Sequence, residues 1–295
     1  MSLSLRARIV QRLIPKIMPG PELSPEEQRA KLSRSLGLPN RRVDVVDLQL
    51  GGVPVTRVTP KGSPRRRHLL HVHGGGFVVG TARGFVGYLS ELALRADATV
   101  TSVDYRLAPE HPYPAAIDDC LAAYRALCDE VAPESLALIG ESAGGNAVLA
   151  TLVRARDEGW TPPNAAVLLS PWVDLTFSGD SIQANQSSEI MLDPALFRSW
   201  RDHYVGDNDP ADPRISPLFA DLAGLPPLHV QATSAEVLED DARRLADKAR
   251  EAGVEVELVV HDDLWHIFQT QVPLVPEASD ALDQAVTFIR THTLG

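Results

Sequence analysis

The feature that most constrains the fold is a regular alternation of short apolar runs and helix-like stretches from residue 43 onward. The apolar runs suit strands buried on both faces, and they cover 43–50, 53–59, 69–72, 99–103, 136–139, 167–169, 228–232 and 254–260. Helical patterns separate most of them, at 84–95, 115–129, 146–158, 240–252 and 277–291. This repeat predicts an α/β fold with a mostly parallel eight-stranded sheet flanked by helices. Gly51-Gly52 predicts a hairpin that adds antiparallel strands at one edge.

Two segments interrupt the alternation. Residues 1–40 have a helical pattern, in which Ser24 is the expected N-cap of a helix with acidic residues in its first turn. Residues 173–216 are long, polar and rich in Asp and Pro, and loops of that length inside a domain are usually functional. We therefore expect 1–40 and the insertion 173–216 to cap a site on a core made of 41–172 and 217–295.

Composition restricts the partners. There are 28 Lys and Arg residues against 39 Asp and Glu, a formal net charge of −11, so nucleic acid is not an expected partner. No apolar run reaches the roughly 18 residues of a spanning helix, so no integral membrane segment is expected. Cys120 and Cys128 are too far apart in a helical stretch for a disulfide, which favours a reducing, cytoplasmic location.

The N-terminal segment allows two interpretations. Residues 1–20 carry Arg6, Arg8, Arg12 and Lys16 among apolar residues at helical spacing. These charges interrupt every apolar run, which is unlike a signal peptide. The segment is either a helix that covers part of the fold, or a membrane-surface or organelle-targeting helix.

The pattern G-x-S-x-G occurs at Gly140-Glu141-Ser142-Ala143-Gly144, between a predicted strand and a predicted helix. A sharp strand-to-helix turn needs small neighbours and exposes its central serine at the end of the sheet. The start of the following helix favours developing negative charge. Ser142 is therefore the candidate nucleophile; the alternative is a glycine-rich turn with an idle serine.

A second glycine motif, His73-Gly74-Gly75-Gly76, directly follows the third predicted strand. Glycines let backbone N–H groups turn toward a bound oxygen without obstruction by side chains. We expect the N–H groups of Gly75, Gly76 and Ala143 to form an oxyanion hole. His73, Gly74, Glu141 and Gly144 are expected to support the two motifs. His71 and His73 share one face of a strand and are an alternative metal pair, but no further ligand spacing follows, so neither metal nor cofactor is expected.

A serine hydroxyl needs a base, and the base needs a carboxylate that orients it. In this arrangement the chain order is serine, acid, histidine. His266 lies between the last predicted strand and the final helix and is the candidate base, whereas His261, at the strand end, resembles a surface residue. The acid is expected in the loop after 228–232. Glu236 precedes the next helix and is preferred, with Asp240, in the first turn of that helix, as the alternative acid.

Together these residues resemble bacterial hormone-sensitive-lipase-like esterases of the α/β-hydrolase superfamily. The resemblance covers roughly 65–290 and is carried by 73–76, 104–110, 140–146, 170–175 and the stretches around Glu236 and His266. In that family the acid loop often reads Asp-Pro-Leu-x-Asp with the first aspartate catalytic, and here it reads Glu236-Val237-Leu238-Glu239-Asp240. Glu141 also stands where many relatives carry aspartate.

The resemblance implies an α/β-hydrolase fold with a cap, and a carboxylesterase that hydrolyses short- to medium-chain acyl esters by a Ser-Glu-His triad through an acyl-enzyme intermediate. A small ester is the expected substrate, and a homodimer is an option by analogy. Two alternatives remain open: an amide-cleaving hydrolase of the same fold, and a non-catalytic small-molecule binding module. The physiological ester is not indicated.

Overall fold

The computed structural model describes residues 3–33, 37–62 and 66–295; the rest of the predicted cap, 1–2 and 34–36, lies outside the described residues. In the described chain, one sheet has eight strands in the order β1-β2-β4-β3-β5-β6-β7-β8. Their bounds are β1 Val43–Leu50, β2 Val53–Pro60, β3 Arg67–Val72, β4 Ala98–Val103, β5 Leu136–Glu141, β6 Ala165–Leu169, β7 Leu228–Thr233 and β8 Val256–His261. β2 pairs antiparallel with both β1 and β4, and all other pairs are parallel. The predicted sheet and its antiparallel edge are confirmed.

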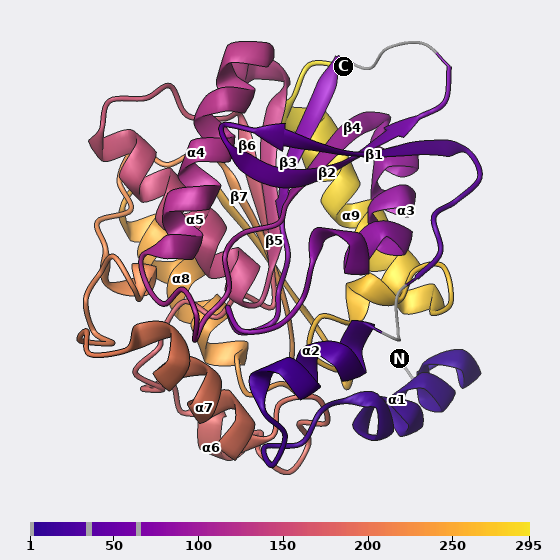
Figure 1. The fold of residues 1–295 in the computed structure, drawn as a ribbon, viewed down its shortest axis with the longest axis vertical. Helices are drawn as coiled ribbons and strands as arrows, with labels where there is room; N and C mark the ends of the chain where they lie inside the picture. Colours follow the sequence, from indigo (N-terminus) through magenta and orange to yellow (C-terminus); the bar gives the residue numbers. More distant parts are fainter. Residues whose placement is uncertain (1–2, 34–36, 63–65) are drawn as a thin grey trace.

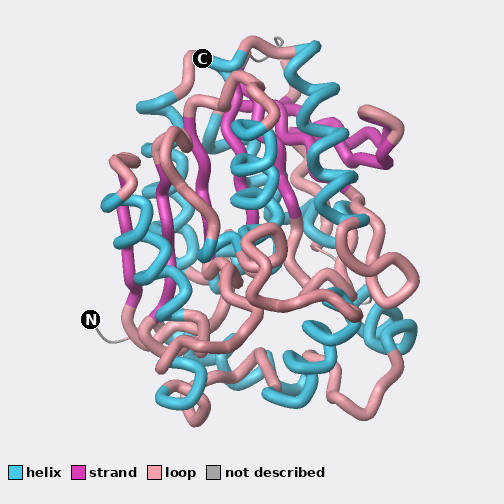
Figure 2. Tube along the Cα trace, turned by 90° about the vertical axis from the view of Figure 1, so that its left-hand side faces the viewer, coloured by secondary structure: helices cyan, strands magenta, loops and turns pink. Residues whose placement is uncertain are grey.

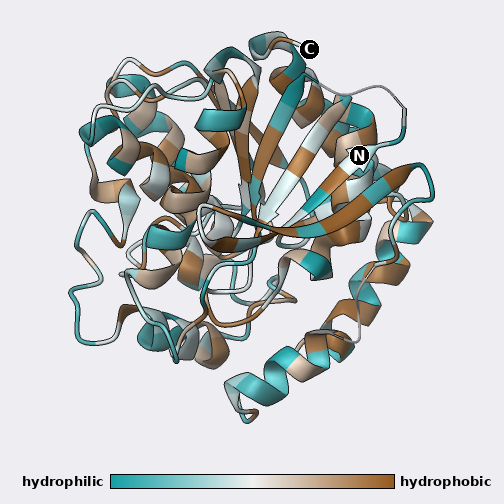
Figure 3. Cartoon of the chain, turned by 45° about the horizontal axis from the view of Figure 1, so that its top comes forward, coloured by the Kyte–Doolittle hydropathy of each residue, from teal (hydrophilic) through white to brown (hydrophobic). Residues whose placement is uncertain are grey.

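Helices cover both faces of the sheet (Figures 1 and 2). They are α3 Val86–Ala96, α4 Ala115–Glu130, α5 Ala143–Asp157, α8 Glu239–Glu251 and α9 Pro276–His292. Helices α4, α5 and α8 pack into one apolar cluster, and α3 and α9 into the other. The central strand β5 serves both, because Leu138 joins the first cluster and its neighbour Ile139 the second. The outer helices carry hydrophobic and hydrophilic residues side by side, as expected of helices with one buried face (Figure 3).

Four further helices gather at one end of the molecule (Figure 1), and we call them the cap helices. They are α1 Leu5–Ile17, α2 Pro25–Ser33, α6 Ser181–Ala184 and α7 Pro194–Val205. Helix α2 begins where expected: the Ser24 hydroxyl accepts from the Glu27 N–H, and the Glu27 carboxylate accepts from the Ser24 N–H. The indole N–H of Trp200 in α7 donates to Gln28 in α2 at 2.8 Å, so the two segments that interrupt the alternation meet.

Short 3-10 helices complete the described chain, at Ala82–Phe85, Pro133–Ser135, Pro217–Phe219 and Phe268–Gln271. No described helix has both the length and the apolar character needed to cross a bilayer. Cys120 and Cys128 are both free thiols.

Candidate active site

Ser142 occupies the turn between β5 and α5. Its backbone has φ 55° and ψ −120°, a conformation that residues other than glycine rarely adopt. Its N–H donates to Leu169 on the neighbouring strand, and its carbonyl accepts from Gly145 and Trp172. These bonds hold the backbone of Ser142 in this strained conformation, which on its own would cost on the order of 1–3 kcal/mol. Helix α5 begins at Ala143 rather than at the predicted residue 146, so the helix N-terminus lies directly beside the serine.

The glycines of the serine motif are required by close packing. A Cβ at Gly144 would lie 2.0 Å from the Val72 carbonyl oxygen, and one at Gly140 would lie 2.4 Å from the Gly144 carbonyl oxygen. Both distances are far below van der Waals contact, so any larger residue would push helix α5 away from the strands. The packing therefore fixes where the serine stands.

The loop after β3 wraps beside Ser142. Gly76 has φ 59°, and a Cβ there would lie 2.5 Å from the Trp200 ring, so a cap helix sits directly on this loop. The Gly75 carbonyl accepts from Val78 and Val79, which fixes the loop. Among the described residues, the N–H groups of Gly75, Gly76 and Ala143 have no acceptor. Unpaired backbone donors of this kind are suited to an external oxygen.

His266 and Glu236 form a buried pair. His266 Nδ1 lies 2.6 Å from Glu236 Oε2, and the side chains are 2% and 0% exposed. Glu236 Oε1 accepts from the Thr233 N–H at 2.8 Å, so both carboxylate oxygens are occupied. Asp240, the alternative acid, points elsewhere, because its Oδ2 accepts from the Ser181 N–H at 2.8 Å. The structure thus brings Glu236, and not Asp240, to the imidazole.

His261 is not the surface residue that its position at the strand end suggested. It is half-buried, and its ring packs edge-on against Phe268 with the centroids 5.0 Å apart. Burial lowers the pKa of this imidazole below its usual value.

Ser142, His266, Gly74 and Gly75 line one cavity of about 470 Å³. The cavity therefore brings together residues from three distant parts of the chain at the carboxyl ends of the parallel strands. The cap helices and the residues around them supply an apolar wall, made of Ile17, Met18, Leu32, Met191, Leu192 and Trp200. The volume lies within the usual range for small-molecule sites.

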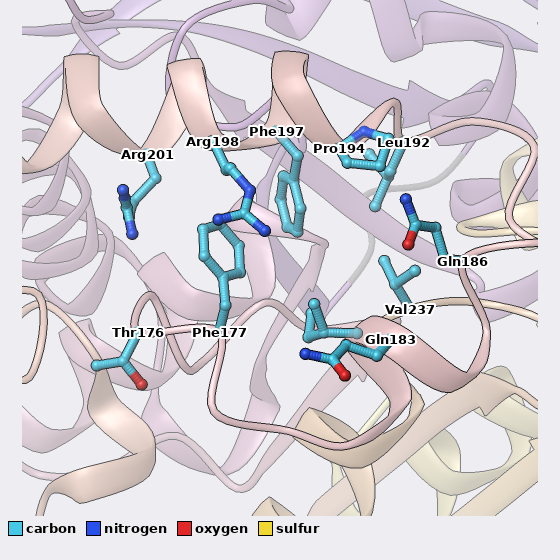
Figure 4. A pocket seen from close by; sticks show the side chains of 11 residues that line it. Thr176, Phe177, Gln183, Gln186, Leu192, Pro194, Phe197, Arg198, Arg201 and Val237 are labelled. Carbon is cyan, nitrogen blue, oxygen red and sulfur yellow. The ribbon is translucent and has the colours of Figure 1, made fainter.

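A second, smaller cavity of about 300 Å³ adjoins the first, and Leu192 lines both. Phe177 and Phe197 form part of its apolar lining, and Arg198 and Arg201 approach the Phe177 ring at 5.9 and 5.1 Å (Figure 4). It contains none of the predicted site residues, so it is not where the serine acts.

His73 supports the glycine loop from below. Its Nδ1 lies 2.8 Å from the Gly74 carbonyl oxygen, and its ring stacks on Tyr105 with the centroids 4.3 Å apart. The Tyr105 hydroxyl donates to the His73 carbonyl. Complete burial lowers the pKa of His73 to about 4, so this imidazole is neutral at physiological pH.

Glu141 points away from the cavity, into the sheet. Its carboxylate lies 2.8 Å from His71 Nε2, and His71 Nδ1 lies 2.7 Å from the Ser102 hydroxyl, with all three residues buried. Both nitrogens of His71 are therefore occupied by protein groups. Within the described part of the chain, no group of three or more His, Cys, Asp and Glu side chains is placed to hold a metal ion.

The contacts that hold the cap helices over the site involve residues that sequence reasoning missed. Arg29 of α2 donates to the carbonyls of Val78 and Ala108 and to both oxygens of Glu110. The hydrogen bonds from Arg29 lower the pKa of Glu110 to about 2. No sequence signal marks Gln28, Arg29 or Trp200, because their partners are distant in the chain.

The chain is similar in sequence and in fold to known proteins. A family model described as the alpha/beta hydrolase fold matches residues 69–270. An esterase of Acinetobacter venetianus is 36% identical over 84% of this chain and 82% of its own, and an acetyl-hydrolase of Streptomyces hygroscopicus is 40% identical over 77% and 76%. The crystal structure of an esterase from the bacterial hormone-sensitive lipase family superposes with a TM-score of 0.95, at 36% identity and 99% coverage of both chains.

These similarities define the class as serine ester hydrolases with the α/β-hydrolase fold. Within that class, the chain belongs to the bacterial hormone-sensitive-lipase-like esterases. The resemblance inferred from the sequence motifs is confirmed, as are the fold class and ester hydrolysis.

Proposed function

We propose that the protein is a carboxylesterase for short- to medium-chain acyl esters, in which Ser142, His266 and Glu236 form the catalytic triad. The observation that carries this proposal is the 2.6 Å contact between His266 Nδ1 and Glu236 Oε2, in a cavity that Ser142 also lines. A carboxylate at Nδ1 fixes the tautomer in which Nε2 is free to accept a proton.

The mechanism follows from these roles. His266 Nε2 accepts the proton of the Ser142 hydroxyl as the oxygen attacks the ester carbonyl. Glu236 stabilises the imidazolium that forms. The imidazolium returns its proton to the leaving alcohol, and water then attacks the acyl-enzyme with His266 as base, releasing the acid. Ser142 supplies the nucleophile and His266 the base, and water is the second reactant.

Negative charge develops on the carbonyl oxygen in each tetrahedral intermediate. The unpaired N–H groups of Gly75, Gly76 and Ala143 support an oxyanion hole at this place. In other enzymes the loss of one such donor costs about 3–4 kcal/mol of transition-state stabilisation. The N-terminus of α5 adds a favourable field.

The cap helices are proposed to close the acyl pocket. The apolar wall around a cavity of about 470 Å³ favours a small acyl group, and the relative from Streptomyces hygroscopicus is named an acetyl-hydrolase. A cytoplasmic location, a homodimer, and the absence of a cofactor and of nucleic-acid binding remain predictions. An amide-cleaving hydrolase remains the second candidate, because the same triad serves ester and amide bonds.

The nucleophile is tested by replacing Ser142 with alanine. We expect hydrolysis of p-nitrophenyl butyrate to fall at least about a thousandfold, because no other group attacks the carbonyl. The matched control is Ser187→Ala, at an exposed serine of the insertion, which should keep full activity. Circular dichroism verifies that both variants fold. Substantial turnover by purified Ser142→Ala would overturn the assignment.

The acyl preference is tested with p-nitrophenyl esters of increasing chain length and with the matching anilides. We expect kcat/KM to be highest for acyl groups of a few carbons and to fall for long chains, because the cavity is closed by the cap helices. A rate that rises steadily to long-chain esters would contradict this preference. Faster cleavage of the anilides would favour the amidase instead.

A further inference from the structure

Helix α1 exposes a continuous apolar stripe. Leu5, Ile9, Leu13 and Ile17 are spaced four residues apart and therefore lie along one side of the helix. Their exposed fractions are 68%, 49%, 49% and 46%, which is unusual for large apolar side chains that follow one another along a helix. About half or more of each of these side chains is therefore open to solvent.

A cationic stripe runs beside the apolar one. Arg8, Arg12 and Lys16 each precede an apolar member by one residue, and Arg6 adds a fourth positive charge. All four cations are exposed, and α1 contains no acidic residue. The whole chain has a net charge of −11, so the positive charge of α1 is opposite in sign to that of the chain as a whole.

The helix is fixed with this side facing outward. On its other side Ala7 and Ile14 are buried in the cluster that contains α3 and α9. At its start the N–H and the hydroxyl of Ser4 both donate to Glu277 of α9, at 2.6 and 2.9 Å. The stripe is therefore exposed while α1 is packed against the rest of the protein.

We propose that α1 is an interfacial helix that docks the protein on an anionic lipid surface. Apolar side chains of such a helix enter the boundary between headgroups and acyl chains, while its cations attract anionic headgroups. A second copy of this chain fits less well, because pairing two such stripes about a two-fold axis would bring two clusters of four cations together. The same helix leads to the active site, since Ile17 and the following Met18 line the catalytic cavity.

Docking would therefore place the cavity at the lipid surface, where amphipathic esters concentrate. This last consequence depends on the proposed esterase function, whereas docking itself does not. The test measures binding to vesicles and not hydrolysis, so the docking proposal and the proposed function can fail separately.

The test is flotation of the purified full chain with vesicles made of equal parts phosphatidylglycerol and phosphatidylcholine, or of phosphatidylcholine alone. We expect the protein to float with the anionic vesicles, less with the neutral ones, and less at high salt. Ile9→Ser/Leu13→Ser and Arg8→Gln/Arg12→Gln should each lower the partition coefficient at least about tenfold. Neither pair lines the catalytic cavity, so hydrolysis of a water-soluble ester should be unchanged.

The matched control is Leu274→Ser, a leucine that is 61% exposed outside α1. It should bind vesicles like the wild type. The proposal is overturned if the wild type does not float, or if the Ile9→Ser/Leu13→Ser variant floats equally well. It is also overturned if light scattering shows a wild-type dimer that this variant converts to a monomer without any vesicle binding, because the stripe would then belong to a second copy.

Discussion

Three acidic side chains near the start of α8 have separate tasks, which explains why glutamate serves as the partner of the imidazole. Asp240 accepts from the Ser181 N–H, and Asp241 accepts from the N–H groups of Val173 and Asp174. Both aspartates are thus committed to the chain around the insertion. Glu236 precedes the helix, and its longer side chain reaches His266 while it also accepts from the Thr233 N–H.

The identity of the acid is tested by Glu236→Gln. We expect kcat to fall about a thousandfold or more, because an amide at this position no longer selects the productive tautomer or stabilises the imidazolium. The matched control is Asp240→Asn, which removes an equal charge four residues after Glu236. Its kcat should stay within a few-fold of the wild-type value. A larger loss in the control than in Glu236→Gln would assign the acid to Asp240.

The sequence identified the candidate residues, but it did not decide between the two candidate acids. Ser142, His266 and the glycine loop follow from motifs and from chain order, both of which are local information. Asp240 stayed open because an acidic residue in the first turn of a helix looks the same whether it caps, bonds a distant loop or orients a histidine. Its contact with Ser181, 59 residues away in the chain, favours Glu236 as the acid, and no local pattern encodes that contact.

Among the elements, helix α2 is hydrogen-bonded to the core through Arg29. Arg29 donates to the carbonyls of Val78 and Ala108, which belong to the two loops that follow β3 and β4. Glu110 accepts from Nη1 and Nη2 of the same guanidinium, and both side chains are partly exposed. The backbone carbonyls, rather than this ion pair, are expected to matter most, because exposed pairs contribute little.

This attachment is tested by Arg29→Met. We expect kcat/KM for p-nitrophenyl butyrate to fall about tenfold, mainly through KM, because a loosened α2 no longer closes the cavity. Glu110→Gln should have a smaller effect, since Arg29 keeps both carbonyls. Arg198→Met, an exposed arginine on another cap helix, is the matched control. Unchanged kinetics in Arg29→Met would show that α2 is held in some other way.

The order and type of the core elements were predictable because each strand and helix has its own hydrophobic period. The cap was predictable only as two segments that interrupt the alternation. The hydrogen bond between Gln28 and Trp200 joins residues 172 positions apart, and no local pattern encodes it. Likewise, the start of α5 at Ala143 was missed because two glycines hide the helical pattern.

In the whole molecule, the fold brings distant groups to one end of a single sheet. The serine follows β5, the glycine loop follows β3, and the acid and base follow β7 and β8. Because these strands are parallel, all four connections lie at the same end of the sheet, and the cap helices cover that end (Figure 2). The candidate site is therefore a consequence of topology as much as of the individual motifs.

The central claim is that one serine, activated by this assembly, performs the reaction. The most direct measurement is the mass of the intact protein, and of its peptides, after treatment with a p-nitrophenyl phosphonate. We predict one adduct per chain, located on Ser142, whose formation parallels the loss of esterase activity and does not occur in Ser142→Ala. Inactivation with the adduct on a different residue, or continued ester hydrolysis by fully labelled protein, would contradict the account.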